Sequence, residues 1–573
     1  MSVRRTAASL NALILPLLLA PTARAQQVAA FTCAGETVSR IEISASPPPF
    51  SGAAKKWQAA AHTIGLHHAT TRDPVIATFL SLAPGRPCTE FRRAESERVL
   101  RAQPFLADAA VRVVRDTAGM VAVMVTTTDE VPVLVSGRLR GIVPEAFSLG
   151  NENIGGEALR IQGRIERGRA YRLSYGLRVE QHALFGHPYR LMLNADQFRV
   201  GHQLSAEIEH PFYTDLQRFS WHGGISTRDD YFHIERPARD LLSLAMTDQA
   251  YDVSALLRVF GTRTVTLLGA AMTGRRVDPA STGIVVSDSG LRPDTGVTLN
   301  SRYASFRSGR IGAIAGIRRV SFKTVRGFDA LVATQDVASG IMLGVFGAKG
   351  LEQFGESDAF VSSALYAGVA RGNALLATLT QVEGRRDQAN GEWDSVIGSA
   401  RNTFYWGAAP GFVFVLADEF SGGRRSRLPL QLTFDDPEGG LMGYSRSALA
   451  GERRNVARGE LRFSAANVTR RADLGFATFG EVGTLWAGDA PYGANATRAS
   501  VGFSILAAYP THSKRMYRAD FAFPLTRSGS GAGRFEVRFS SEDRTQRFWE
   551  EPRDLSRART GTQPSRLFAW PTQ

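Results

Sequence analysis

Cysteine is scarce in this chain of 573 residues, which contains only Cys33 and Cys88. Two cysteines this far apart, with no others nearby, do not match the ligand spacing of a zinc site. In an oxidising compartment the pair favours a disulfide that closes a long loop and stabilises a small domain. Two free thiols, one of them buried, are the alternative.

Long apolar stretches are also absent after the N-terminus. No segment beyond residue 25 offers the roughly 18 uncharged apolar residues that a membrane-spanning helix needs. The N-terminus has Arg4 and Arg5, an apolar stretch around Leu10 to Ala20, and Ala23-Arg24-Ala25 before Gln26. This pattern predicts a secretory signal peptide over residues 1–25. We therefore expect an exported protein in which any membrane-spanning part consists of β-strands.

The motifs of common enzymes are missing as well. The sequence has no Gly-x-Ser-x-Gly, no His-Glu-x-x-His, no paired-carboxylate constellation and no phosphate loop. Ser528 to Gly533 is glycine-rich, but it lacks the Lys-Ser/Thr of a phosphate loop and favours a hairpin turn. His62, His67 and His68 have no matching acidic or cysteine cluster, so an exposed helix end explains them better than a metal site. We expect no enzyme, no cofactor and no metal.

The charge is basic but evenly spread. There are 68 Lys and Arg residues against 54 Asp and Glu, a net charge of +14, without any basic block. Nucleic acid is therefore not an expected partner. On an exported chain this surface favours solubility or contact with anionic lipid headgroups.

The first hundred residues of the mature chain predict a small mixed domain with the order β-α-α-β-β. Its strands are Val38 to Ile43, ended by Pro47 to Pro49, then Ala110 to Val114 and Met120 to Val125, with a turn at Asp116 to Gly119.

Two helices complete this domain. The first is predicted over Ala53 to His68, with Trp57, Ala60, Ala61 and Ile64 on one face. The second is predicted over Thr89 to Gln103, with Thr89 as the N-cap and an apolar stripe of Phe91, Ala94, Val99 and Ala102.

From about Leu134 onward, runs of 8 to 12 residues alternate polar and apolar side chains between turn residues. Tyr517, Ala519, Phe521 and Phe523, for example, share a face opposite Arg518 and Asp520. A charged face beside an aromatic face suits a barrel with water inside and lipid outside. About 25 residues per strand predict roughly 16 strands over residues 133–550. A soluble sandwich or propeller is the alternative.

The N-terminal segment resembles a single POTRA (polypeptide-transport-associated) domain of the BamA/TamA superfamily of outer-membrane assembly proteins. The residues that carry this resemblance are Pro84-Gly85, Ser96 to Arg101, Phe105 to Ala109, Val121 to Val125 and Thr128-Asp129. The resemblance implies that residues 26–132 form a periplasmic domain that binds client proteins by adding a strand to a sheet edge. A small structural domain without a client is the alternative.

The barrel segment resembles the same family at both of its ends. Leu184 to Gly186, Tyr189 to Leu193 and Glu209 to Phe212 resemble its opening strands. Phe479 to Gly483 with Trp486, Val501 to Phe503, and Asp520, Phe521, Phe523 and Pro524 resemble its closing strands. The resemblance implies a monomeric barrel in the bacterial outer membrane, in contact with its lipid.

Barrels of this family carry a Val-Arg-Gly-Phe loop that folds into the lumen. Val325 to Phe328 is that string, but it lies too early in the chain, between predicted strands at Ile311 to Phe322 and Gly340 to Phe346. Gly439 to Arg454 lies at the corresponding place, and we identify it as the lumen loop. The residues that match are Gly440, Leu441, Met442, Gly443, Tyr444, Gly451, Glu452 and Arg453.

Met442 stands where the family has an arginine. A guanidinium can hold carboxylates of the lumen wall through a charged fork, and a thioether cannot. The anchoring contact is therefore lost or supplied by Arg446, Arg453 or Arg454.

The last residues also depart from the family, because about thirty residues follow Phe539. The last strand can extend as far as Trp549, and residues 551–573 form either a periplasmic extension or a lumen plug.

The sequence leaves two candidate functions. The resemblance implies insertion or translocation of other proteins; the alternative is a passive pore or structural barrel without that activity.

Overall fold

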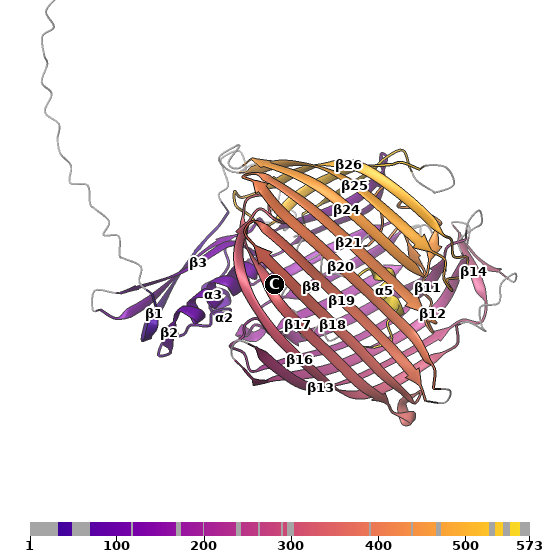
Figure 1. Ribbon diagram of the computed structural model, residues 1–573, viewed down its shortest axis with the longest axis horizontal. Coiled ribbons are helices and arrows are strands. Elements are labelled where there is room, and N and C mark those ends of the chain that lie inside the picture. Colours follow the sequence, from indigo (N-terminus) through magenta and orange to yellow (C-terminus); the bar gives the residue numbers. More distant parts are fainter. Residues whose placement is uncertain are drawn as a thin grey trace, which may run out of the picture.

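The structure is a computed structural model in which a small domain stands at one end of a large barrel (Figure 1). The predicted signal peptide, the helix expected at Ala53 to His68 and the three histidines near it lie outside the described residues. Described are residues 32–48, 69–115, 119–167, 173–198, 200–236, 242–261, 264–287, 290–294, 303–388, 391–436, 439–465, 472–526, 533–541 and 551–561.

The small domain is a four-stranded sheet with helices on one side. Its sheet order is β2-β1-β4-β3, in which β1 runs parallel to β4 and β3 runs antiparallel to β4. The elements are β1 (Ala34–Ser46), α2 (Asp73–Thr78), β2 (Pro87–Thr89), α3 (Glu90–Ala102), β3 (Leu106–Arg115) and β4 (Val121–Asp129). The predicted strands lie within β1 and β3 and, apart from Met120, within β4, whereas α2 and β2 are additional.

Helix α3 begins directly after Thr89, its predicted N-cap. The Thr89 side chain accepts a hydrogen bond from the Arg92 N–H, and Glu90 and Arg101 complement the helix dipole. The predicted apolar stripe was wrong, because Phe91 is 50% exposed and Ala94 is exposed. The buried face instead carries Glu95, Ser96, Arg98, Val99 and Leu100, since α3 lies between its own sheet and the barrel.

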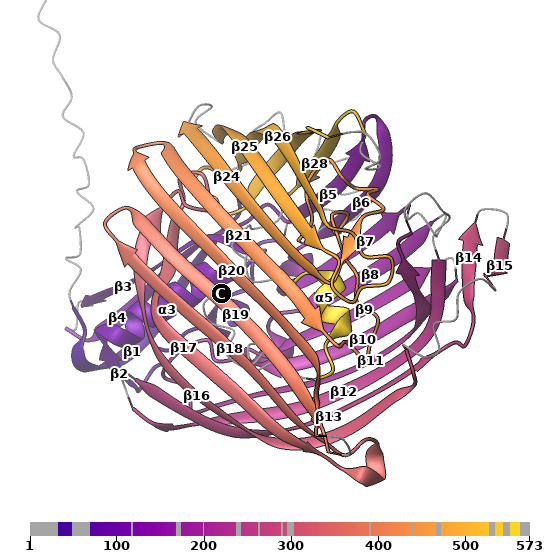
Figure 2. The ribbon, with the colours of Figure 1, turned by 45° about the vertical axis from the view of Figure 1, so that its right-hand side comes forward.

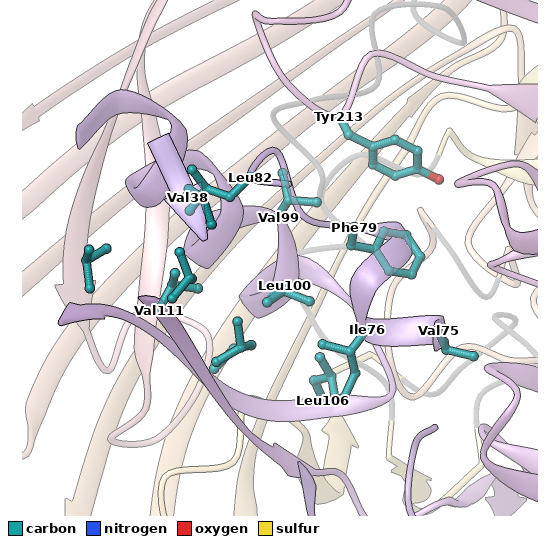
Figure 3. Packing of buried hydrophobic residues seen from close by; sticks show 14 of the residues in the cluster. Val38, Val75, Ile76, Phe79, Leu82, Val99, Leu100, Leu106, Val111 and Tyr213 are labelled. Atoms are coloured by element: carbon teal, nitrogen blue, oxygen red, sulfur yellow. The ribbon is translucent and has the colours of Figure 1, made fainter. Parts of the chain in front are cut away.

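The core of the domain extends into the barrel (Figure 3). Cys33 and Cys88 are joined by a disulfide, with their Cα atoms 5.2 Å apart, and both are buried in this core. Tyr213, from a barrel turn, packs edge-on against Phe79 of the domain with ring centroids 6.0 Å apart. The domain and the barrel therefore share one hydrophobic cluster, and their contact does not depend on the connecting chain alone.

Over the described part of the chain the barrel is closed by twenty strands, not the sixteen predicted. The estimate failed because it allowed about 25 residues per strand, whereas many connections are only a few residues long. A closed ring also contradicts the sandwich and the propeller. The strands are β5 (Val133–Arg140), β6 (Val143–Asn151), β7 (Leu159–Glu166), β8 (Ser174–Gln181), β9 (Arg190–Phe198), β10 (Gly201–His210), β11 (Phe219–Ile234), β12 (Leu242–Phe260), β13 (Val265–Pro279), β16 (Phe306–Arg326), β17 (Thr334–Gly350), β18 (Asp358–Arg371), β19 (Ala374–Asp387), β20 (Trp393–Ala409), β21 (Phe412–Arg424), β24 (Arg453–Ala465), β25 (Asp473–Trp486), β26 (Ala496–Ala508), β27 (Met516–Pro524) and β28 (Glu536–Ser540).

Three short additions complete the barrel. The hairpin of β14 (Gly283–Ser287) and β15 (Gly290–Asp294) projects from one rim, while β13 pairs directly with β16 (Figure 2). The connection from β21 to β24 contains the pair β22 (Leu432–Thr433) and β23 (Ala450–Gly451). Helix α5 (Arg553–Ala558) follows the last strand and lies inside the barrel in both ribbon views.

The two faces of the wall differ in polarity, as a membrane barrel requires. Large apolar side chains stand exposed on the outside, and arginines and carboxylates are buried inside. Examples of the outer set are Leu204, Ile225, Val253, Leu376 and Ile505, each between 49% and 65% exposed. No helix among the described residues is long and apolar enough to cross a membrane.

The small domain marks one end of the barrel, which we name the domain end. There Asn153, in the β6–β7 turn, donates to the Thr71 hydroxyl over 2.8 Å, and the His182 ring lies 5.9 Å from that of Phe105. Connections alternate between the ends, so the β21–β24 loop starts at the opposite, far end.

Candidate functional site: the seam, the inward loop and the C-terminal plug

The barrel closes through a short seam between its first and last strands. β28 pairs with β5 over five residue pairs, from Glu536 opposite Arg140 to Ser540 opposite Ser136. The β16–β17 pair has seventeen. At the domain end the Val135 N–H donates to the Ser541 side chain over 2.8 Å, and the Ser541 N–H donates to the Val135 carbonyl over 2.8 Å. The neighbouring β27–β28 pair also has only five residue pairs, so the two junctions made by the short last strand β28 have the fewest ladder pairs in the ring.

An aromatic ring covers the seam from one side. Phe539 lies over Gly137, where an added Cβ would stand 2.2 Å from the ring. Its neighbour across the seam is Phe147, with ring centroids 6.4 Å apart. Glycine at position 137 is therefore required for this ring to cross from β28 to β5.

The predicted lumen loop does fold inward. Leu441, Met442 and Tyr444 are almost completely buried, and Leu441 and Tyr444 pack with Phe434 and Leu485. Gly440 donates to the Asp436 carbonyl over 2.7 Å. Gly443 has φ +91°, a conformation that favours glycine and turns the loop toward β28.

The loop binds both sides of the seam. The Gly443 N–H donates to Glu536 of β28 over 3.0 Å, and the Arg446 guanidinium donates to Glu145 of β6 over 2.9 Å. The Tyr444 hydroxyl donates to the Ala499 carbonyl over 2.9 Å. Since β6 pairs with β5, the loop bridges the seam from inside the lumen.

The position of Met442 is held without an arginine side chain. Its N–H donates to Glu481 over 3.0 Å, and its side chain packs with Phe479 and Ala522. The guanidinium that meets Glu481 belongs to Arg458 of β24, 2.8 Å away and 4.4 Å above the Phe479 ring. Arg458 was not among the candidates, because its strand register with β25 is decided only by the folded barrel.

The three predicted substitutes for the missing arginine have different places. Arg446 bridges to Glu145 as described. Arg454 is fully buried and lies 3.3 Å from both Glu419 and Asp436, so it fixes the base of the loop. Arg453 is exposed and does not face the lumen.

The remaining motif residues lie where the loop returns to the wall. Gly451 belongs to β23, and a Cβ there would stand 2.5 Å from the Trp486 carbonyl oxygen. Glu452 is buried and accepts the Asp489 N–H over 2.9 Å. These two residues join the loop to the β25–β26 turn rather than to the seam.

The closing-strand residues divide between the two faces of β27. Asp520 faces inward and accepts from the Ser504 hydroxyl over 2.6 Å. Phe521 stacks on Phe503 with centroids 4.8 Å apart, and Phe523 is 37% exposed. Pro524 ends the strand and stands beside Gly443, so the lumen loop and β27 meet at this point.

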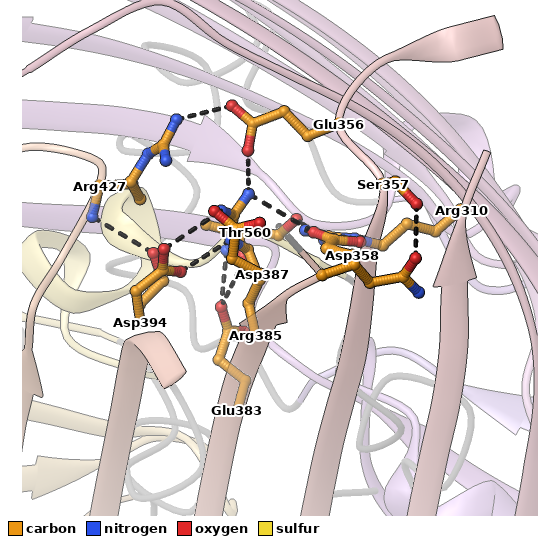
Figure 4. A network of polar contacts seen from close by, with 12 residues as sticks. Arg310, Glu356, Ser357, Asp358, Glu383, Arg385, Asp387, Asp394, Arg427 and Thr560 are labelled. Atoms are coloured by element: carbon orange, nitrogen blue, oxygen red, sulfur yellow. Dashed lines mark hydrogen bonds and ion pairs between the residues drawn. The ribbon is translucent and has the colours of Figure 1, made fainter. Parts of the chain in front are cut away.

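Residues 551–561 lie in the lumen as a plug, the second of the two alternatives, and residues 562–573 lie outside the described residues. The backbone of the plug enters hydrogen bonds with the wall: the Arg310 guanidinium donates to the Thr560 carbonyl over 2.6 Å, and the Thr560 N–H donates to Glu383 over 2.6 Å (Figure 4). Arg310 is itself held by a buried fork to Asp358. Residues 542–550, including the proposed strand extension to Trp549, lie outside the described residues.

The plug also supports the inward loop. Leu555 and Ala558 of α5 pack with Leu430 and Leu432 of the loop and Ile397 of β20. Asp554 accepts from the Thr433 N–H over 3.3 Å. Loop and plug thus form one body that occupies the lumen toward the far end.

At the domain end, α3 docks on the barrel mouth. Arg98 forms a fork with Glu95, donates to the Tyr213 carbonyl, and lies 4.2 Å from the Phe322 ring centroid of β16. Arg101 donates to Asp336 over 2.7 Å. Burial raises the pKa of Glu95, but its bonds to Arg98 outweigh this and leave the pKa below its ordinary value.

The string Val325 to Phe328, set aside above as the lumen loop, has another place. Val325 and Arg326 end β16, and Gly327 and Phe328 begin the turn at the domain end. That turn also enters the barrel: Phe328 stacks on Tyr405 with centroids 5.2 Å apart, and the Tyr405 hydroxyl donates to Asp329 over 2.6 Å.

The edge strand β3, a candidate for client binding, is partly protected. The Val111 N–H donates to Glu97 over 3.0 Å, and the Val111 carbonyl accepts from Arg93 over 2.9 Å. The Ala109 N–H donates to the adjacent Asp108 side chain. An added strand would have to displace these side chains from the middle of the edge.

Comparisons with known proteins give similarity of architecture only. No family model and no curated protein matches the chain. Among solved structures, CdiB from Escherichia coli is similar at 11% identity and TM-score 0.43, covering 92% of this chain and 94% of that one. BamA from Haemophilus ducreyi lacking POTRA domains 1–3 is similar at 13% identity and TM-score 0.33, covering 88% and 84%. The alcaligin outer membrane receptor FauA from Bordetella pertussis is similar at 9% and 0.30, covering 74% and 69%. TM-scores below 0.5 at such identities assign the chain neither family nor function.

No metal centre accompanies this site. Within the described residues there is no group of three or more His, Cys, Asp or Glu side chains placed to hold a metal ion.

Proposed function

We propose that this protein is an outer-membrane barrel of the BamA/TamA type that assists the insertion or translocation of other proteins. The carrying observation is the short β28–β5 seam, which five residue pairs close and which the Gly443–Arg446 part of the loop bridges from inside. A junction that exchanges few backbone bonds is the place where a barrel can open and pair with a client strand.

Two further observations support this proposal over a passive pore. The lumen holds the inward loop and the C-terminal plug, packed together through Leu555 and Leu432. The small domain is bound firmly at the mouth by Arg98 and Arg101, so a client held there would lie beside the barrel. An open pore for solutes needs neither feature.

The client route follows from the domain's edges. On β3, Arg93 and Glu97 occupy the backbone groups of Val111. We propose that a client strand replaces these side-chain contacts when it pairs with β3. Because the contacts must break first, we expect reversible binding with a low association rate.

The experiment is depletion of the protein in its native host, followed by quantitative profiling of the outer membrane. Loss of particular barrels or secreted proteins, restored by the wild-type gene, is the expected result. Unchanged protein content together with altered solute permeability would overturn the proposal and favour the passive pore.

A further inference from the structure

The outer face of the barrel wall carries a row of polar side chains on adjacent strands. Thr378 of β19, Asn402 of β20 and Asp418 of β21 are register partners, and these strands lie side by side in Figure 2. Glu419, which follows Asp418, faces the lumen, where it meets Arg454 at 3.3 Å. Because side chains alternate along a strand, Asp418 and its two partners point outward. We name these three residues the polar row.

Asp418 stands in the middle of the lipid-facing wall. It is the seventh of the thirteen residues of β21, and its outward neighbours Leu416 and Phe420 are 46% and 40% exposed. A carboxylate at this depth is unfavourable, because the hydrocarbon of a membrane does not solvate its charge. An ionisable group in such a position therefore marks a candidate binding site.

In the described part of the chain, two amide groups and no cation hold this carboxylate. The Asn455 amide donates to Asp418 over 2.8 Å, and the Asn402 amide donates over 3.4 Å. No Lys, Arg or His of the described residues forms an ion pair with it. By contrast, the outward carboxylate of Asp278, near the far rim, pairs with Arg276. The charge of Asp418 is therefore hydrogen-bonded but not neutralised by the residues that the structure describes.

A recess in the wall adjoins Asp418. Its register partner on β24 is Ala457, and the next outward position on that strand is Gly459, opposite Gly480 of β25. An added Cβ at either glycine would meet no atom within 4 Å, so the space outside both is open. Glycines on the surface of a strand let another backbone approach closely.

We infer that the polar row and this recess bind a membrane-spanning segment of another protein that presents an arginine or a lysine. A cation is the partner that an uncompensated carboxylate favours most in a medium of low dielectric constant. The ammonium of a lipid headgroup stays at the membrane surface, whereas Asp418 lies in the middle of the wall. A symmetric contact between two copies of this chain would place Asp418 against Asp418, and like charges repel each other.

The first test uses the purified full-length mature protein in phosphatidylcholine vesicles. Three fluorescent leucine-rich helices of about 21 residues are added, which differ only in a central Lys, Gln or Glu. Their association is followed by energy transfer to a label on the barrel. We expect the Lys helix to bind at least about threefold more tightly than the Gln helix, and the Glu helix to bind most weakly.

The variant is Asp418→Asn. The matched control is Asp278→Asn, which makes the same change at a carboxylate that already has a cation. The variant should lose the preference for the Lys helix, and the control should keep it. The thermal unfolding midpoint of the variant alone should be equal to that of the wild type or higher, because no charge then faces the lipid. This measurement shows that the lost preference is not caused by unfolding.

The second test identifies the partner in the native host. Ala457→p-benzoylphenylalanine places a photo-crosslinker beside Asp418, and the crosslinked protein is identified by mass spectrometry. We expect a membrane-spanning segment with an Arg or Lys at the crosslink. Asp418→Lys should abolish this crosslink, and replacing the partner's cation with Glu should restore it.

Four outcomes would overturn the inference. They are equal binding of the Lys and Gln helices, a Lys preference that persists in Asp418→Asn, an unfolding midpoint lowered by that substitution, and crosslinks only to lipid or to a second copy of this chain. None of these results depends on the seam, so the proposed insertion activity can fail while this inference stands.

Discussion

Arg446 is the residue through which the inward loop reaches the β5–β6 side of the seam. Its guanidinium is about one-third exposed, whereas Glu145 is buried and also lies 3.2 Å from Arg140. A partly exposed pair of this kind contributes about 1 kcal/mol or less. The Arg446–Glu145 pair matters because it joins the loop to β6 beside the seam, not because it is strong.

Replacing Arg446 with Gln should loosen the seam without unfolding the barrel. We expect the backbone amides of β5 and β28 to exchange hydrogen several-fold faster, measured by mass spectrometry, because the longer Asp435–Arg138 ion pair, at 3.6 Å, then remains as the side-chain contact from the loop to β5. The matched control is Arg453→Gln, since Arg453 is exposed and directed away from the lumen. Equal exchange in both variants would show that the loop does not bridge the seam.

Asp554 makes the plug sensitive to pH. Burial of its carboxyl, and then the charge of Asp436, raises its pKa to about 6. A raised pKa means that the folded protein binds this proton more tightly than the unfolded chain. The seated plug is therefore less stable above pH 6 and gains stability as the pH falls through about 6 toward 4.

We expect hydrogen exchange of residues 551–561, corrected for the intrinsic pH dependence of exchange, to be slower at pH 5 than at pH 7.5. Asp554→Asn should remove most of this difference, because its side chain keeps the shape but does not titrate. Faster corrected exchange at pH 5 would contradict the assignment.

At the scale of elements, the plug and the inward loop stabilise each other. Leu555 is fully buried between Leu430, Leu432 and Ile397, so removal of the plug exposes the apolar side of the loop. Replacing one such leucine with Ala costs about 2–5 kcal/mol in a packed core. Loop and plug should therefore leave the lumen together.

Truncation after residue 550 should raise the ion conductance of the barrel in planar bilayers and make residues 425–452 sensitive to protease from the far side. Leu555→Ala should give a smaller change in the same direction, and Ser556→Ala, at an exposed position of the same helix, should give none. Unchanged conductance and protease resistance after truncation would show that the loop closes the lumen alone.

At the scale of the whole molecule, the proposed activity requires the ring to open at one junction. Ser136 and Ser540 are register partners across the seam, and Ser136 and Ser148 are partners across the neighbouring β5–β6 pair. Both pairs contain Ser136. The Ser136–Ser540 pair crosses the seam, whereas the Ser136–Ser148 pair joins two neighbouring strands on one side of it.

A disulfide between Ser136→Cys and Ser540→Cys should abolish complementation of the depleted host, and a reductant should restore it. Ser136→Cys with Ser148→Cys is the matched control and should complement under both conditions. Full activity of the oxidised seam variant would exclude lateral opening and leave the lumen as the only route.

Local patterns in the sequence determined much of this architecture. Alternation of apolar and charged residues predicts strands with one lipid face and one wet face, because side chains of a strand point to opposite sides whatever its partners are. Thr89 predicts the start of α3, because a cap needs only the residues beside it. The sequence also predicted the inward position of Gly439 to Tyr444, from the family resemblance. It predicted the pairing of Cys33 with Cys88 because the chain has only these two cysteines.

Only the tertiary structure decided what depends on residues far apart in the chain. The count of twenty strands depends on connection lengths, and the partner of Glu481 depends on the register that brings Arg458 beside it. The buried face of α3 follows from its contact with the barrel mouth rather than from its own apolar residues. The position of residues 551–561 depends on backbone carbonyls that accept hydrogen bonds from arginines of the wall, such as Arg310. Every residue has a backbone carbonyl, so the sequence does not show which ones accept these bonds.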